Sequence, residues 1–234
     1  MKPLIRSILT MIIACTDATA VADDFQDGVS AYERDDFQTA LHKFRLASHN
    51  GSTSAKYNLG QMHRRGEGVK KDYTIAAKWF KEAAEEGDAE AAYNLGTMLD
   101  AGQGLEQDSK EAVRFYRIAA DQGIPQAEYN LAAMYRSGYG VTKDTTIAAY
   151  WYLKAARKGI AEAQYRLASL YLDGDGIPTD IVRAHMWFSL AELNGYLEGG
   201  IERGRIESKM TAQEIDLSNS IGIKCLAYKL TKCK

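Results

Sequence analysis

The sequence contains four histidines, the side chains best suited to bind zinc or to act as a general base near neutral pH. They are His42, His49, His63 and His185, and no two of them have the i, i+4 spacing of a zinc-binding HExxH helix. The sequence also has no GxSxG nucleophile elbow, no phosphate-binding Walker loop and no paired CxxC. Because no nucleophile has a base beside it in the sequence, we expect a protein without catalytic activity, metal or cofactor.

Two further patterns could bind ions. Asp173 and Asp175 lie in one glycine-rich turn and could bind a cation, although a solvated turn is the simpler interpretation. Gly102 and Gly104 form a G-x-G turn, but this turn follows a predicted helix, where the helix dipole is negative and repels phosphate. We expect His185, inside a predicted helix, to have a packing or surface role.

The first residues have the pattern of an export signal. Lys2 and Arg6 precede an apolar stretch over residues 7–14 that is too short to span a bilayer, and an A-x-A cleavage pattern ends at Ala22. The alternative is lipidation at Cys15, which ends an Ile-Ile-Ala-Cys stretch similar to a bacterial lipobox. The sequence therefore predicts an exported protein, periplasmic or secreted, or alternatively an envelope lipoprotein that touches the membrane only if Cys15 is lipidated.

Cleavage after Ala22 would leave two cysteines, Cys225 and Cys233, and an even pair in an oxidising compartment is a disulfide candidate. A continuous helix would separate residues eight positions apart by about 12 Å. This distance exceeds the reach of a disulfide, so a bond requires a turn between them, near Thr231. The alternative is two unpaired thiols in a frayed tail.

A block of 36 residues repeats without a gap, which is typical of a solenoid. Four glycines mark its period: Gly68, Gly104, Gly140 and Gly176. Each block reads as a first helix (helix A) that ends at a paired-glycine turn and a second helix (helix B) that begins at an aspartate cap. The caps are Asp72, Asp108, Asp144 and Asp180. The sequence thus predicts an all-α, right-handed superhelical solenoid of antiparallel helix pairs in one elongated array.

The period also predicts the organisation of the chain. We expect a signal peptide over 1–22, an N-terminal capping helix pair over 23–51, repeats over 52–87, 88–123, 124–159 and 160–195, and C-terminal capping helices with a tail over 196–234. Thr211 and Glu214 form a capping box at the start of the last predicted helix.

The repeated pattern A-x-Y-N-L-G-x-M, followed by G-x-G-V, an aspartate, W-F and A-A-x-x-G, covers residues 55–195. It resembles the Sel-one-like repeat family, a bacterial relative of the tetratricopeptide repeats. One cysteine-rich branch of that family is linked to binding or cleaving β-lactams and carries a C-x7-C pair in each repeat. Here C-x7-C occurs once, outside the repeats.

In a right-handed solenoid of this kind, helices A line the concave face, where related tetratricopeptide domains hold peptide carboxylates. Asn58, Asn94, Asn130 and Arg166 are equivalent positions of successive helices A, and Gln61, Thr97 and Ser169 share their face. Arg65 belongs to a basic end of the first helix A. These eight residues form the predicted peptide-binding surface. For the asparagines, a structural role in hydrogen-bonding the backbone between helices is an open alternative.

The 234 residues carry a net charge of -2, which gives no sign of the basic stripe of a nucleic-acid-binding protein. The missing catalytic motifs and the repeat together predict a non-enzymatic scaffold or adaptor that binds a protein or peptide in the bacterial cell envelope. The alternative is a cell-envelope hydrolase of β-lactam type.

Overall fold

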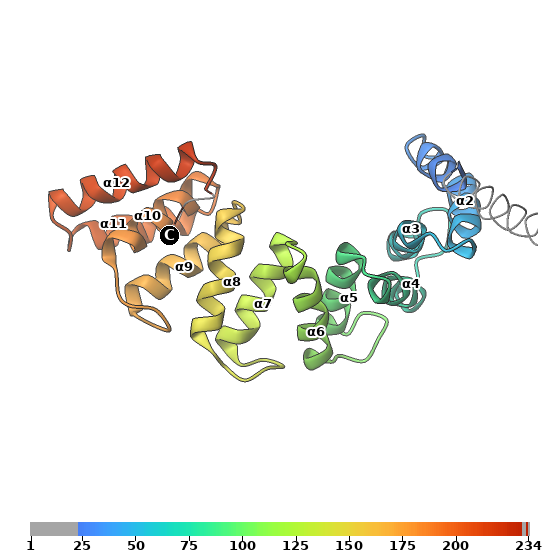
Figure 1. Ribbon diagram of the computed structural model, residues 1–234, viewed down its shortest axis with the longest axis horizontal. Coiled ribbons are helices and arrows are strands. Elements are labelled where there is room, and N and C mark those ends of the chain that lie inside the picture. The colour runs from blue at the N-terminus through green and yellow to red at the C-terminus, as the bar shows by residue number, and fades with distance from the viewer. Residues whose placement is uncertain (1–22, 231–232, 234) are drawn as a thin grey trace, which may run out of the picture. The chain divides into compact units, whose positions relative to one another are not determined.

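The computed structural model describes residues 23–230 and 233, and every regular element in that part of the chain is a helix (Figure 1). This confirms the predicted all-α repeat fold. Residues 23–32 form the first described helix. The others are α2 (Phe37–His49), α3 (Thr53–Arg65), α4 (Tyr73–Glu85), α5 (Ala89–Ala101), α6 (Ser109–Asp121), α7 (Pro125–Ser137), α8 (Thr145–Arg157), α9 (Ala161–Asp173), α10 (Ile181–Leu193), α11 (Leu197–Glu207) and α12 (Ala212–Ala227).

The chain divides into two compact units, residues 1–108 and 109–234. In the first unit α3 packs against α2 and α4, and α4 packs against α5. In the second unit each helix from α6 to α10 packs against the next, and α12 packs back on α10. The boundary between the two units falls between helix A and helix B of the second repeat of the predicted array.

Local rules place the helix ends. The side chains of Asp72, Asp144 and Asp180 each accept a hydrogen bond from the backbone N–H three residues later, as predicted for the start of helix B. The turn that precedes helix B needs glycine for two reasons at Gly104. Its φ is +72°, and a Cβ atom there would lie 2.3 Å from the carbonyl carbon of Tyr73, so no larger residue fits without a backbone shift.

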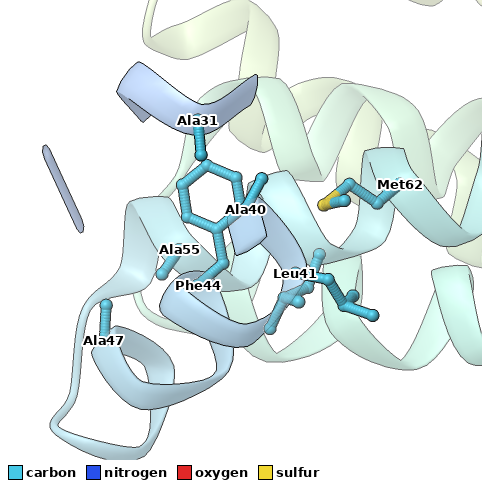
Figure 2. Packing of buried hydrophobic residues seen from close by; sticks show 8 residues of the cluster. Ala31, Ala40, Leu41, Phe44, Ala47, Ala55 and Met62 are labelled. Atoms are coloured by element: carbon cyan, nitrogen blue, oxygen red, sulfur yellow. The ribbon is translucent and has the colours of Figure 1, made fainter. Parts of the chain in front are cut away.

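The core of each unit is made from small and aromatic side chains that interlock between adjacent helices. At the N-terminal end, Ala31 joins the buried side chains of α2 and α3 around Phe44, which is 1% exposed (Figure 2). One aromatic position of helix B is buried in every repeat: Phe80, Tyr116, Tyr152 and Phe188 are each at most 1% exposed. Every repeat therefore has a buried ring at this position, and only Tyr116 and Tyr152 carry a hydroxyl on it.

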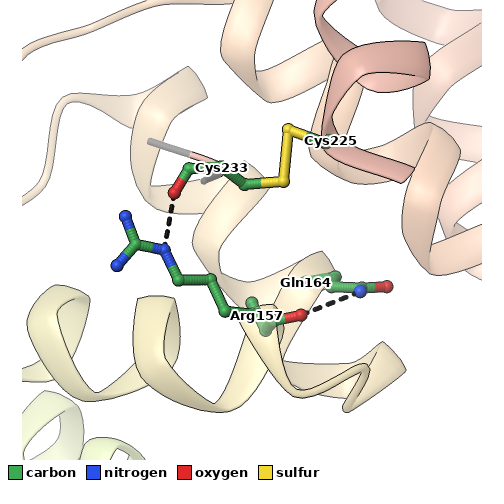
Figure 3. Close-up of a disulfide and its surroundings, with 5 residues drawn as sticks. Arg157, Gln164, Cys225 and Cys233 are labelled. Carbon is green, nitrogen blue, oxygen red and sulfur yellow. Dashed lines mark hydrogen bonds between the residues drawn. A yellow bond between two sulfur atoms is a disulfide. The ribbon is translucent and has the colours of Figure 1, made fainter. Parts of the chain in front are cut away.

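The C-terminal end closes with α12, whose Thr211 and Glu214 form the predicted capping box. After α12, Lys229 and Leu230 adopt left-handed backbone conformations and turn the chain back. The turn brings Cys233 to Cys225, and the two are joined as a disulfide with their Cα atoms 5.2 Å apart (Figure 3).

The tail is also held from another helix. The Arg157 side chain of α8 donates a hydrogen bond of 2.5 Å to the backbone oxygen of Cys233, while the neighbouring Gln164 donates to Ala156 (Figure 3). Within residues 23–230, no helix is both long and apolar enough to span a bilayer. The expected cleavage site at Ala22 and the alternative lipidation site at Cys15 lie outside the described residues.

Candidate functional site

The predicted asparagine positions of helices A are engaged with their own helices. Asn58 donates a hydrogen bond of 2.9 Å to the carbonyl oxygen of Ser54, and Asn94 donates one of 2.7 Å to that of Glu90. Asn94 is also only 6% exposed. Each amide thus bonds to the backbone one turn earlier, within one helix rather than between helices, which leaves little of Asn94 for a ligand.

The smaller predicted residues behave in the same way. The Thr97 hydroxyl donates to the carbonyl of Asn94 at 2.7 Å, and the Ser169 hydroxyl donates to that of Tyr165 at 3.1 Å. Gln61 donates to the Tyr57 hydroxyl at 2.7 Å. These side chains form hydrogen bonds within their own helices. Those bonds would compete with hydrogen bonds to a partner.

The first unit brings Arg65 to the N-terminal cap. Its guanidinium donates to the Tyr32 hydroxyl at 3.1 Å and lies 3.7 Å from the carboxylate of Glu67, to which Tyr32 donates at 2.6 Å. Burial and the Glu67 carboxylate raise the pKa of Tyr32. His63, two residues earlier on α3, is buried, and burial lowers its pKa. The basic end is thus reduced to Arg64 and a partly neutralised Arg65.

The second unit gathers tyrosines around Arg166. The guanidinium lies 5.6 Å from the centre of the Tyr165 ring, and the Tyr129 side chain of α7 raises its pKa. Tyr165 in turn packs against Tyr196 with ring centres 5.0 Å apart, and Tyr129 packs against Tyr152 at 5.8 Å. Three helices, α7, α8 and α9, and the turn before α11 therefore contribute to one arginine–tyrosine cluster, which consists of Tyr129, Tyr152, Tyr165, Arg166 and Tyr196.

The cluster stabilises the positive charge of Arg166. Partial burial alone lowers the pKa of Arg166, but the side chain of Tyr129 and the oxygens of Tyr152 and Tyr196 outweigh it and hold that pKa above its usual range. Asn130, the equivalent residue of α7, is half-buried on the same unit. Of the eight predicted residues, the second unit thus holds Asn130, Arg166 and Ser169, and the first unit holds the other five.

The C-terminal cap contains a polar cluster that the sequence motifs did not indicate. His185 of α10 is 1% exposed; its Nδ1 lies 2.8 Å from the Ser218 hydroxyl of α12, and its Nε2 lies 2.9 Å from a carboxylate oxygen of Glu207 on α11. The sequence shows no nucleophile with a base beside it, but the fold brings the Ser218 hydroxyl next to the His185 ring. Ser218 stands 33 residues from His185, so no short motif could have paired them.

We call this cluster (His185, Glu207 and Ser218) the His185 clasp. It contains the side-chain types of a catalytic triad but lacks the N–H donors that would bind an oxyanion. Acyl transfer needs N–H donors aimed at the developing oxyanion. Ser218 lies inside α12, where the neighbouring peptide N–H groups are used in the hydrogen bonds of the helix itself. Ser218 also lines an apolar cavity of about 450 Å³ between α10 and α12. The clasp therefore ties three helices together, and its carboxylate is held ionised: the hydrogen bond to His185 lowers the pKa of Glu207.

Metal-binding side chains do not gather in the part of the chain that the structure describes. Within residues 23–230 and at 233, no three His, Cys, Asp or Glu side chains are placed to hold a metal ion. Asp173 and Asp175, the carboxylates of the fourth glycine turn, are both exposed.

Comparison with known proteins places this geometry in a family. The Sel1 repeat matches residues 53–88, 89–124, 125–160 and 161–196, each one residue later than the predicted boundaries. A Sel1 repeat protein from Oxalobacter formigenes is 35% identical over 68% of this chain and 65% of that chain, with a TM-score of 0.64. A protective antigen of uropathogenic Escherichia coli that displays an SLR fold is 25% identical, with a TM-score of 0.60.

The antigen comparison covers 94% of this chain and 58% of that chain, so this chain spans about three fifths to two thirds of the length of the two structures. A search of curated proteins found no match. The four repeat matches cover more than half of the residues and coincide with the helix pairs α3–α4, α5–α6, α7–α8 and α9–α10. The chain therefore belongs to the Sel1 repeat family, the Sel-one-like repeats that its sequence pattern resembles.

Proposed function

We propose that this chain is a non-enzymatic adaptor of the bacterial cell envelope that binds an extended protein or peptide segment on the surface formed by its helices A. Sel1 repeat proteins are generally scaffolds for protein–protein interaction. A helical hairpin array provides an extended surface on which such a segment can lie. The envelope location is supported by the signal-like residues that end at Ala22.

The observation that carries the binding surface is the arginine–tyrosine cluster. Arg166 replaces the asparagine that the other three repeats have at the same position, and its guanidinium is only partly buried. Arginine and tyrosine are enriched at protein interfaces, because both present a large rigid group with a polar end. We therefore place the strongest partner contacts on the second unit, around α7 and α9.

Site-specific photo-crosslinking tests this placement. A photo-reactive phenylalanine at Gln126, which is exposed on α7 one turn before Asn130, should trap a partner in envelope extracts. The matched control carries the same group at Tyr150, which is 55% exposed on helix B of the same repeat. Equal trapping at both positions would contradict binding through helices A.

The location has its own test. The mass of the mature chain should correspond to a first residue at Asp23, as predicted by cleavage after Ala22. A mass that corresponds to a lipid-modified Cys15 would instead identify an envelope lipoprotein.

A further inference from the structure

The helix α11 continues the repeat but has no helix B of its own. It begins at Leu197, which is 36 residues after α9 begins at Ala161, so it occupies the place of a fifth helix A. In the repeats a helix A packs against the helix B that follows it, as α3 does with α4, α7 with α8 and α9 with α10. The helix that follows α11 is α12, but α12 packs on α10 and makes at most weak contact with α11. The side of α11 that would receive a helix B is therefore open.

Gly204 of α11 shows what is missing. Its equivalents in the four repeats are small and buried: Gly60, Gly96, Ala132 and Ala168. At Gly60 an added Cβ atom would lie 2.7 Å from the ring of Phe80, which helix B places over the glycine. Gly28 of the N-terminal helix pair meets the Phe44 ring at the same distance. Gly204 is exposed, and an added Cβ atom there would meet nothing within 4 Å, so the place of the ring is empty.

Nothing in the described part of the chain requires glycine at position 204. The other two glycines of α11 lie against α10: a Cβ atom on Gly199 would meet the carbonyl oxygen of Phe188, and one on Gly200 would meet the carboxylate of Glu192. Glycine inside a helix is less favourable than almost any other residue. A glycine that weakens its helix and faces open space is explained if a side chain from outside the chain uses that space.

Apolar side chains lie on the same side of α11. Leu197 and Ile201 precede Gly204 at helical spacing and are 72% and 70% exposed. Ile201 occupies the tyrosine position of the repeats, where the tyrosine ring packs against the ring of helix B. The ring centres are 5.9, 5.8 and 5.3 Å apart in the pairs Tyr57–Phe80, Tyr129–Tyr152 and Tyr165–Phe188. In α11 the corresponding side chain has no such partner and faces solvent.

The sequence of α12 explains why it does not act as this helix B. In the repeats the buried ring stands eight residues after the aspartate cap, as Phe80 follows Asp72. Eight residues after Thr211, the cap of α12, stands Asn219, which is polar and exposed. The His185 clasp holds α12 on α10 instead. The chain therefore has no ring of its own to place over α11.

We propose that the open side of α11 formed by Leu197, Ile201 and Gly204, the helix-B seat, binds an amphipathic helix of a partner protein. This helix supplies the missing helix B and places an aromatic ring over Gly204. The residues of the seat correspond to positions that face helix B in the repeats, not to the predicted peptide-binding positions. The inference therefore goes beyond the proposed function and does not depend on it.

The repeats specify the chemistry of the partner helix. Each helix B has an alanine four residues after its cap and an aromatic residue eight residues after it, and the alanines are all 0% exposed: Ala76, Ala112, Ala148 and Ala184. The partner helix would begin beside the C-terminal end of α11, where Arg205 and Lys209 are exposed, so an acidic first turn would complement them. A second copy cannot supply such a helix from its folded repeats, because its own helix-B rings are each at most 1% exposed.

Titration by NMR tests the seat on the full chain, with the backbone amides of α11 as the readout. The probe is a peptide with the sequence of residues 72–86, which contains the cap, the alanine and the ring of a helix B. The control peptide has alanine in place of Phe80. We expect saturable shifts centred on Gly204 and about 10-fold weaker binding of the control peptide, because a buried aromatic side chain usually dominates such an interface. Absence of saturation, or the largest shifts outside α11, would overturn the proposal.

One substitution separates binding from folding. Gly204→Leu fills the place of the ring and should weaken binding of the peptide at least about 10-fold. Its thermal unfolding midpoint should stay the same or rise, because nothing lies within 4 Å and leucine is the better helix former. Glu198→Leu is the matched control, since it adds the same side chain at an exposed position of α11 outside the seat. Unchanged affinity in Gly204→Leu, or an equal loss in Glu198→Leu, would refute the seat.

Sedimentation velocity tests whether a second copy is the occupant instead. We expect Gly204→Leu to leave the sedimentation coefficient of the chain unchanged, because the seat is reserved for a partner protein. A dimer that Gly204→Leu converts to a monomer would show that a second copy covers α11, and the assignment to a partner helix would then be wrong.

Discussion

Replacing Ser218 with alanine tests whether the His185 clasp stabilises the C-terminal cap. Glu207 is a carboxylate and can only accept, so Nε2 of His185 carries the hydrogen that bonds it. In the neutral ring, Nδ1 must then accept its hydrogen from Ser218. Ser218→Ala removes that donor and leaves Nδ1 unpaired in a side chain that is 1% exposed.

An unpaired buried acceptor costs about 1–3 kcal/mol, and we expect Ser218→Ala to lower the free energy of unfolding of the second unit by that amount. Urea unfolding followed by circular dichroism measures the loss, and hydrogen exchange of α12 locates it. Ser208→Ala is the matched control, because the Ser208 hydroxyl is exposed and donates only to the carbonyl of Arg205.

A double-mutant cycle separates the hydrogen bond from the loss of packing. His185→Leu removes the ring that both partners bond, so Ser218→Ala should cost much less in that background than in the wild type. We expect a coupling energy of about 1–2 kcal/mol. The clasp would be refuted if Ser218→Ala cost no more than Ser208→Ala, or if the two substitutions were additive.

Three further predictions concern the termini and the turns. Cys225→Ser opens a loop of 8 residues and should destabilise the tail and α12 by at most about 2.5 kcal/mol, seen as faster hydrogen exchange of α12. Gly104→Ala should lower the unfolding free energy by about 2–4 kcal/mol, because it adds a backbone clash to the strain of a positive φ, whereas Gly87→Ala, with φ +100° and open space around it, should cost only about 1 kcal/mol. The pKa of Glu207 is lowered by its hydrogen bond to His185, so the stability from this group is complete above the unfolded pKa of the carboxyl and disappears as pH falls through the lower folded value. Acid unfolding followed by circular dichroism should therefore be less steep in Glu207→Gln, and identical acid limbs would contradict this assignment.

The helices could be predicted from the sequence because their signals are local. A cap such as Asp72 acts on an N–H three residues away, and a buried ring such as Phe80 returns at a fixed period, so both are readable without a structure. The clasp of His185 and Ser218 was not predictable in this way. It depends on how α12 returns to α10, a tertiary contact that leaves no short-range pattern.

The sequence predicts only part of the binding surface: the positions of its residues, but not the hydrogen bonds of their side chains. Spacing correctly places Asn94 and Thr97 on one helix, but it does not show that both side chains bond to the carbonyl oxygens of that helix. A short polar side chain inside a helix always has such a carbonyl within reach, and solvent or a ligand must compete with it. Sequence position therefore overestimates how many polar residues on a helix face are available to a partner.

A repeat protein contains its own controls, because each position is occupied several times in nearly the same surroundings. Leu131 and Leu167 are both at most 1% exposed, so their shared identity reflects the core. A residue that differs from its equivalents and does not pack in the core must be explained by something other than folding. Arg166 differs in this way, whereas the hydroxyl of Tyr152 does not, because Tyr116 carries the same hydroxyl at the equivalent position. Arg166 is therefore better explained by a contact outside the core than by the fold, because asparagine fills the same position in the other three repeats.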